Sequence, residues 1–133
     1  MTTKQFLFLT TSVIASCLIV ASPRASAEPD QPRIVRLAEL EIDPAQLEAC
    51  KAALKEEIEA SIRIEPGVLT LYAVSVKDHP DQIRLFEIYR DQASYQAHLQ
   101  SPHFKKYKSL TQHMVRSLTL VETEPLLLGS KPG

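Results

Sequence analysis

The stretch VLTLYAVSVKDHPDQIRLFEIYR, residues 68–90, decides the fold of this chain. Side chains alternate in character across 68–77 and again across 82–90, with the two-residue period of a β-strand. Asp78-His79-Pro80-Asp81 separates the two runs and is typical of a turn. The stretch therefore predicts two antiparallel strands joined as a hairpin.

A helical pattern precedes this hairpin. Asp43 is the expected N-cap, Pro44 occupies the first turn, and Gln46 would complete a capping box. Glu65-Pro66-Gly67 ends the pattern. Its apolar positions recur at helical spacing: Leu47, Cys50, Leu54 and Ile58. We therefore expect one amphipathic helix that buries Cys50 as a small hydrophobic residue.

A second helical pattern follows the hairpin. Asp91 is its expected N-cap, and Ser101-Pro102 interrupts it, with Pro102 suited to the first position of a continuing helix. The predicted apolar face of the continuation comprises Phe104, Tyr107, Thr111, Met114 and Leu118.

Strand patterns at 33–42 and about 119–124 complete the order β-α-β-β-α-β. This order predicts an α+β, ferredoxin-like fold: a four-stranded antiparallel sheet with two helices on one face. The strands carry apolar residues on both faces, and no further layer remains to cover the second face. Because a large bare apolar face marks an interface, we expect a homodimer whose sheets pack face to face.

The first 27 residues have the character of a secretory signal peptide. Lys4 precedes an apolar run, and Ala25-Ser26-Ala27 is typical of a cleavage site. The run is short for a membrane span, so we expect cleavage after Ala27 and a periplasmic or secreted bacterial protein with no stable membrane span. An uncleaved anchor and lipidation at Cys17 are the alternatives. Residues 28–32 would then form a flexible lead-in, 33–124 the folded domain, and 125–133 an apolar tail.

The composition excludes several classes of protein. Lys plus Arg number 15 and Asp plus Glu number 16, a balance that argues against a nucleic-acid partner. The chain has three glycines and no Gly-rich phosphate loop, which argues against a nucleotide cofactor. Only Cys50 remains after the expected cleavage, so it is either buried or paired between chains.

Three strings carry a resemblance to a known family: EPG (65–67), FEIYRD (86–91) and AHLQSPHF (97–104). With the spacing of the elements over about 33–123, they resemble the antibiotic biosynthesis monooxygenase family, whose small bacterial members include quinol monooxygenases. The resemblance implies a dimeric α+β barrel. It also implies oxidation of a quinol, a phenol or a polycyclic aromatic molecule by O₂, with no cofactor.

That chemistry requires a base, donors that stabilise an anion, and a dry pocket for the ring. His98, in the third string, is the proposed base, because imidazole titrates near neutral pH. Glu87 lies on an otherwise apolar strand face and would orient His98 or contact the substrate. The expected substrate contacts are Tyr72, Tyr89, His103 and Phe104.

Two metal-dependent readings are disfavoured. A site of His98, His103 and Glu87 is disfavoured because the histidines are five residues apart across a proline. Haem degradation in related barrels uses Asn and Trp, and this chain contains neither. We therefore expect no metal and no cofactor.

Two other functions stay open. The first is a dimer that binds a small aromatic or signalling molecule without catalysis. The second is an isomerase of a small oxygenated signal molecule, which would need acid and base groups but no O₂. Uptake of O₂ separates both from a monooxygenase.

Overall fold

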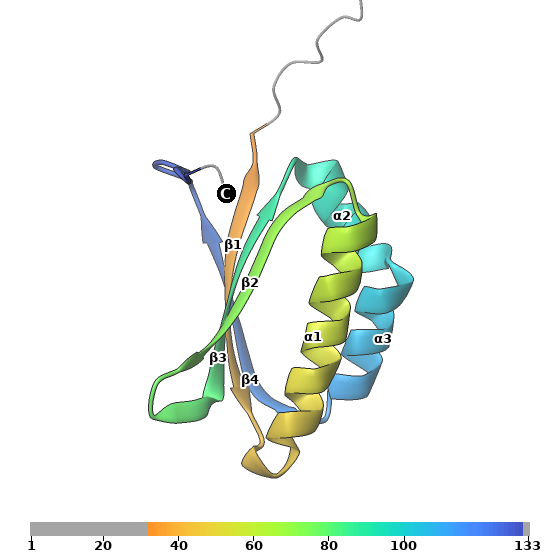
Figure 1. Cartoon of the computed structure of the whole chain (residues 1–133), viewed down its shortest axis with the longest axis vertical. Helices are drawn as coiled ribbons and strands as arrows, with labels where there is room; N and C mark the ends of the chain where they lie inside the picture. The colour runs from red at the N-terminus through yellow and green to blue at the C-terminus, as the bar shows by residue number, and fades with distance from the viewer. Residues whose placement is uncertain (1–31, 132–133) are drawn as a thin grey trace, which may run out of the picture.

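The computed structural model describes residues 32–131, and the predicted signal peptide lies outside them. Four strands form one antiparallel sheet, and three helices cover one of its faces (Figure 1). The elements run in the order β1 (Ile34–Ile42), a short 3₁₀ turn η1 (Pro44–Gln46), α1 (Leu47–Ile64), β2 (Val68–Val76), β3 (His79–Tyr89), α2 (Gln92–Gln100), α3 (Pro102–Thr111) and β4 (Val115–Thr123).

The strand order across the sheet is β2-β3-β1-β4, with all three neighbouring pairs antiparallel. The predicted α+β, ferredoxin-like architecture is therefore confirmed. The second predicted helical segment is divided into α2 and α3. The hydroxyl of Ser101 accepts a hydrogen bond from the Phe104 amide and so caps α3, which begins at Pro102. The register places Arg36 of β1 directly opposite Glu87 of β3.

Three local predictions need correction. The hairpin turn is shorter than expected: β3 already begins at His79, and Asp78 takes a positive φ of 64°. Leu118 belongs to β4 instead of a helix, since α3 ends at Thr111. The capping box does not form, because the Asp43 amide donates to the Met114 carbonyl; the Asp43 carboxylate instead accepts from the Ala45 amide.

The core lies between the sheet and the helices. It is a single apolar cluster from β1, α1, β3 and α3, made of Ala38, Leu40, Ile42, Cys50, Leu54, Ile83, Leu85 and Tyr107. Cys50 is fully buried, and burial raises the pKa of its thiol. Of the two alternatives for Cys50, the structure therefore favours burial over a disulfide between chains. Among the described residues, no helix is long and apolar enough to cross a membrane.

The opposite face of the sheet carries exposed apolar side chains. Tyr72 is 66% exposed and Phe86 37%, and the register sets these two residues beside each other. Leu37 lies next to Phe86 on β1, and Val121 lies next to Leu37 on β4. An apolar row therefore crosses all four strands on the side away from the helices.

Gly67 permits a close approach between the α1–β2 connection and α2. A Cβ atom at this position would lie 2.3 Å from Ser94 Cβ. The Gly67 carbonyl also accepts a hydrogen bond from the Arg90 amide, which ties the α1–β2 connection to the residue that follows β3.

We predict that Gly67→Ala lowers the free energy of unfolding by about 2–4 kcal/mol, because a side chain there must displace the start of α2. Chemical denaturation measures this change. Gly129→Ala is the matched control, since a Cβ there meets nothing within 4 Å. Ser94→Gly should recover part of the loss in the double variant; no recovery would mean that the contact with Ser94 is not the cause.

Candidate functional site

A cavity of about 110 Å³ lies between the helix-covered face of the sheet and the helices α2 and α3. Most of its wall is apolar or aromatic, with Leu85, Phe104 and Leu120 among the lining residues. Its polar lining comes from Arg36, Glu87, Tyr89, Tyr95, His98, Tyr107, Lys108 and Thr111. An apolar cavity with a few converging polar groups is the usual form of a small-molecule site.

Glu87 is the carboxylate of this cavity. The Tyr89 hydroxyl donates a hydrogen bond to Glu87 Oε2 at 3.0 Å, and no hydrogen bond to Glu87 Oε1 is found within residues 32–131. Burial raises the pKa of the Glu87 carboxyl, although the Tyr89 hydrogen bond opposes part of the shift. Burial, followed by the charge of Glu87, raises the pKa of Tyr89, which stays a neutral donor. Glu87 is therefore a proton acceptor whose affinity for a proton is increased.

Arg36 and Lys108 are the two cationic residues that line the same cavity, and Arg36 lies directly opposite Glu87 in the sheet. The Arg36 side chain is 13% exposed, its Nη2 donates to Glu122 Oε1 at 3.1 Å, and its guanidinium carbon lies 4.5 Å from the centre of the Tyr95 ring. Its Nε is buried and has no hydrogen-bond partner in the described part of the chain. Although Arg36 and Glu87 are cross-strand neighbours, no ion pair between them is found there. A cation and a carboxylate thus line one cavity while each keeps capacity for a ligand.

A second set of ionisable groups surrounds His98, which is only 3% exposed. His98 Nδ1 lies 3.0 Å from Glu65 Oε1, and His98 Nε2 lies 3.6 Å from Glu57 Oε1. His103 Nε2 also contacts Glu65 Oε1, and the Ser61 hydroxyl donates to Glu57 Oε1 at 2.7 Å. We call Glu57, Glu65, His98 and His103 the His–Glu cluster.

The two carboxylates of this cluster differ in their affinity for a proton. Burial raises the pKa of Glu57. Burial also tends to raise the pKa of Glu65. The hydrogen bonds from His98 and His103 outweigh this effect, so the pKa of Glu65 lies below its ordinary value. Glu65 is therefore an ionised acceptor, and both rings turn an N–H toward it.

More than half of the chain matches the model of a known protein family. The model of the antibiotic biosynthesis monooxygenase family matches residues 33–110. The chain belongs to this family. A solved structure named as a candidate monooxygenase of the family, from Bacteroides thetaiotaomicron, is 50% identical, with a TM-score of 0.74 over 77% of this chain and 97% of that one.

More distant structures share the fold with this member of the family. A family protein from Nitrosomonas europaea is 23% identical, with a TM-score of 0.67 over 72% of this chain and 92% of that one. A protein from Mycobacterium tuberculosis is 24% identical, with a TM-score of 0.67 over 74% and 99%. No curated protein matches the chain.

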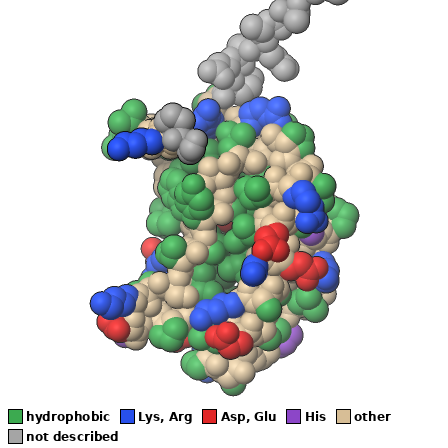
Figure 2. Space-filling view, in the orientation of Figure 1, with side chains coloured by type: hydrophobic (Ala, Val, Ile, Leu, Met, Phe, Trp, Pro, Cys, Tyr) green, Lys and Arg blue, Asp and Glu red, His purple; other side chains and the backbone are tan. Residues whose placement is uncertain are grey.

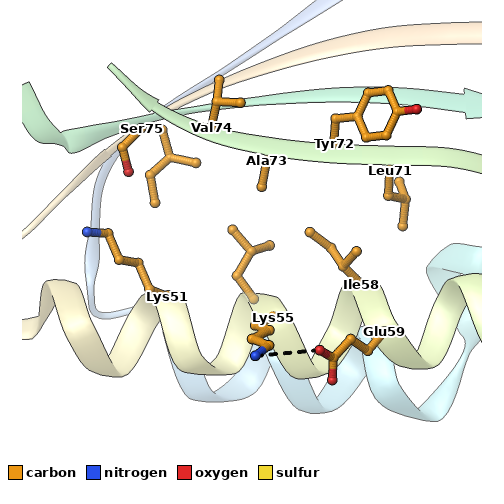
Figure 3. A pocket seen from close by; sticks show the side chains of 11 residues that line it. Lys51, Lys55, Ile58, Glu59, Leu71, Tyr72, Ala73, Val74 and Ser75 are labelled. Atoms are coloured by element: carbon orange, nitrogen blue, oxygen red, sulfur yellow. Dashed lines mark ion pairs between the residues drawn. The ribbon is translucent and has the colours of Figure 1, made fainter. Parts of the chain in front are cut away.

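Four of the six residues predicted for this monooxygenase-family site line the cavity: Glu87, Tyr89, His98 and Phe104. The other two do not. Tyr72 points away from the helices on the open face of the sheet (Figure 3). His103 turns from the cavity to Glu65, because it follows Ser101-Pro102 at the start of α3, beside the end of α1. Neither Tyr72 nor His103 lines this cavity, and their contacts with substrate stay predictions.

The predicted partnership of Glu87 with His98 is also different. No hydrogen bond or ion pair joins them in residues 32–131, and Glu65 occupies the position next to His98 Nδ1. Sequence reasoning missed Arg36, Glu57 and Glu65. A signal for Glu57 was present: Cys50, Leu54, Glu57 and Ser61 follow one another at spacings of four, three and four, and all four are buried on one face of α1.

A larger, more open groove of about 600 Å³ runs between α1 and β2. Figure 3 shows Leu71, Ala73 and Ser75 pointing from β2 toward the helix, and hydrophobic side chains are visible between these elements in Figure 2. Its charged side chains are Lys51, Lys55 and Glu59, and Lys55 pairs with Glu59 at 3.7 Å. The groove lacks a buried proton acceptor, so we place the candidate site in the smaller cavity.

Proposed function

We propose that this chain oxidises a single-ring phenol or hydroquinone with O₂, without a metal or organic cofactor, and that Glu87 is the base. The observation that carries the proposal is the placement of Glu87 and Arg36 in one cavity with no ion pair between them in the described residues. Family membership supports the coarser assignment to monooxygenases.

The volume of the cavity favours a single aromatic ring. An apolar cavity of about 150 Å³ binds benzene, and this one is smaller, at about 110 Å³, but only partly enclosed. Leu118 and Leu120 of β4 line the cavity and are half exposed. A single ring would therefore fill the cavity, and a substituent would extend out of it toward β4.

Deprotonation is the step that these residues can supply. Triplet O₂ reacts slowly with a closed-shell phenol, whereas a phenolate transfers one electron to it more readily. Glu87 Oε1 would accept the phenolic proton, and its raised affinity for a proton brings the two groups closer in pKa. The Arg36 guanidinium would stabilise the phenolate, and its Nε–H, which has no partner among the described residues, would donate the hydrogen bond.

The electrons and atoms balance without a further reactant. The phenolate passes one electron to O₂, and the resulting radical pair combines at a ring carbon to form a C–O bond. Loss of water from this adduct breaks the O–O bond and leaves a carbonyl. One oxygen atom stays bound to a ring carbon of the product, and the other leaves as water. A hydroquinone thus becomes a hydroxyquinone.

In this proposal His98 is a positioning residue. Both its ring nitrogens face carboxylates, so neither is free to take a proton from the substrate. Its ring packs against Tyr89 and Phe104, with centroid distances of 5.3 and 4.8 Å. It therefore fixes two walls of the cavity, in place of the role as base expected from the sequence.

Consumption of O₂ tests the proposal. Purified protein should consume one O₂ for each hydroquinone, faster than the uncatalysed blank, and isotopically labelled O₂ should leave one labelled atom in the product. Binding of the ring with no O₂ uptake would instead establish a binding module. Turnover of a carbonyl substrate with no O₂ uptake would establish an isomerase.

We predict that Arg36→Gln lowers kcat by about 10²-fold, since it removes the charge that stabilises the phenolate. Initial rates of O₂ uptake over a range of hydroquinone concentrations measure the change. Arg116→Gln on β4 is the control, because Arg116 is exposed, pairs with Asp43 and does not line the cavity. Equal rates for wild type and Arg36→Gln would remove Arg36 from the mechanism.

We also propose that two copies associate through the open faces of their sheets. The apolar row of Leu37, Tyr72, Phe86 and Val121 supports this arrangement, because exposed apolar side chains aligned across a sheet form a surface suited to burial against a copy of itself.

Export with cleavage after Ala27 is a further proposal, and the intact mass of the mature protein distinguishes it from lipidation at Cys17.

A further inference from the structure

We propose that the His–Glu cluster binds one divalent transition-metal ion, with Zn²⁺ as the representative, through Glu57, His98 and His103. The proposed metal site shares His98 with the wall of the cavity, but metal binding does not require the proposed oxidation chemistry. Each of the three residues offers a ligand atom, and these atoms lie within 4.8 Å of one another. The residues come from three elements, α1, α2 and α3, that meet at this point.

The distance between His98 and Glu57 suits a shared ion better than a direct hydrogen bond. His98 Nε2 and Glu57 Oε1 are 3.6 Å apart, which is long for a hydrogen bond. Two ligands at about 2.0–2.1 Å from a tetrahedral zinc lie about 3.4 Å apart. Two small spaces of about 30 and 10 Å³ border Glu57, one lined also by His98 and the other by His103.

Glu65 supplies the outer carboxylate that metal-bound histidines commonly have. A histidine ligand usually donates its other N–H to a carboxylate, which fixes the ring and the tautomer. Glu65 Oε1 lies 3.0 Å from His98 Nδ1, so an N–H on Nδ1 would donate to it and leave the lone pair of that ring on Nε2, the nitrogen that faces Glu57. Ser61 donates to Glu57 and holds the third ligand in the same way.

The charge of the cluster also favours a divalent cation. The cluster brings two carboxyl groups together in a region where Glu57 is buried and the Glu65 side chain is 14% exposed. Lys106, which lines a small space together with Glu57 and His103, pairs with Glu56 at the surface. A divalent ion would balance the two carboxylates, and two imidazoles with a carboxylate are ligands that Zn²⁺ accepts.

Titration of the untagged, metal-free full chain with ZnSO₄ tests the site. Isothermal titration calorimetry should give one ion per chain. His103→Ala should weaken binding by about 100-fold or more, and Glu65→Gln, which changes only the outer carboxylate, by about 10–100-fold. His79→Ala and His113→Ala are the matched controls, since both histidines are exposed and outside the cluster; they should bind Zn²⁺ like wild type.

A measurement on the wild type avoids dependence on the folding of variants. Co²⁺ bound by two nitrogens and a carboxylate oxygen in a four- or five-coordinate site absorbs more strongly in the visible range than the aqueous ion, and added Zn²⁺ should remove this band. Absence of saturable Zn²⁺ binding up to about 1 mM would overturn the proposal. So would equal binding by wild type and His103→Ala, or loss of binding in the His79 or His113 variants.

Discussion

Replacing Glu87 with Gln is expected to lower kcat for a hydroquinone by about 10²–10⁴-fold, while it raises the melting temperature by about 2–5 °C. Gln keeps the size of Glu and can still accept from the Tyr89 hydroxyl, but it cannot take a proton. The gain in stability has a separate cause: the folded state buries this carboxylate, and a neutral amide removes the cost. O₂ uptake and thermal unfolding on the same sample measure both effects.

The shifted pKa values of three buried or half-buried carboxyl groups, Glu87, Glu57 and Glu65, make the stability of the fold depend on pH. Because the pKa of Glu87 and of Glu57 is raised in the folded state, that state holds these protons more tightly than the unfolded chain. Their contribution to stability is full below the ordinary value of 4.5 and is lost as pH rises through the raised values. Glu65 acts oppositely: its contribution is present above 4.5 and is lost as pH falls through its lowered pKa.

Glu41→Gln is the control for Glu87→Gln, because Glu41 is an exposed carboxylate of the same sheet. It should change neither kcat nor the melting temperature. A fall in melting temperature for Glu87→Gln would mean that this carboxylate stabilises the fold. An unchanged kcat would return the role of base to another group, with His98 the first to test.

Replacing Phe86 with Arg is expected to weaken self-association by about 30-fold or more. Phe86 lies inside the apolar row, between Tyr72 of β2 and Leu37 of β1. In a face-to-face dimer two copies of this residue would be buried near the centre, and a buried unpaired guanidinium there is costly. Sedimentation velocity over a range of concentrations measures the shift from dimer to monomer.

Ile62→Arg is the matched control for this change. Ile62 is also a large apolar residue that is about half exposed, but it lies on α1, away from the open face. It should leave the dimer intact. A wild type that sediments as a monomer at every concentration would contradict the proposed assembly, and so would a Phe86→Arg protein that remains dimeric.

The fold was largely predictable because its boundaries depend on local chemistry. Pro44, Gly67 and Pro102 lie at the starts of elements in the structure as they do in the sequence pattern. The turn after β2 was less predictable. Asp78 adopts a positive φ, and β3 begins directly after it, at His79. The start of β4 depends on pairing with β1, which is a tertiary contact that no local pattern contains.

The candidate site was predictable only in part, for the same physical reason. Residues on one strand face could be read from alternation, so Glu87 and Tyr89 were found. Arg36 was missed because its role depends on the register that sets β1 against β3, 51 positions apart in sequence. Glu65 was identified only as part of a helix-ending string, whereas in the structure it contacts two histidines from α2 and α3.

The ionisation of a phenol inside the cavity tests the central claim most directly. Para-nitrophenol absorbs differently as phenol and phenolate, so its spectrum can be recorded without O₂ at a pH where the free molecule is mostly protonated. The wild-type protein should shift the bound ligand toward phenolate, and Glu87→Gln and Arg36→Gln should each reduce that shift. A ligand that binds the wild type yet stays protonated would contradict the assignment of Glu87 and Arg36 as base and anion-stabilising group.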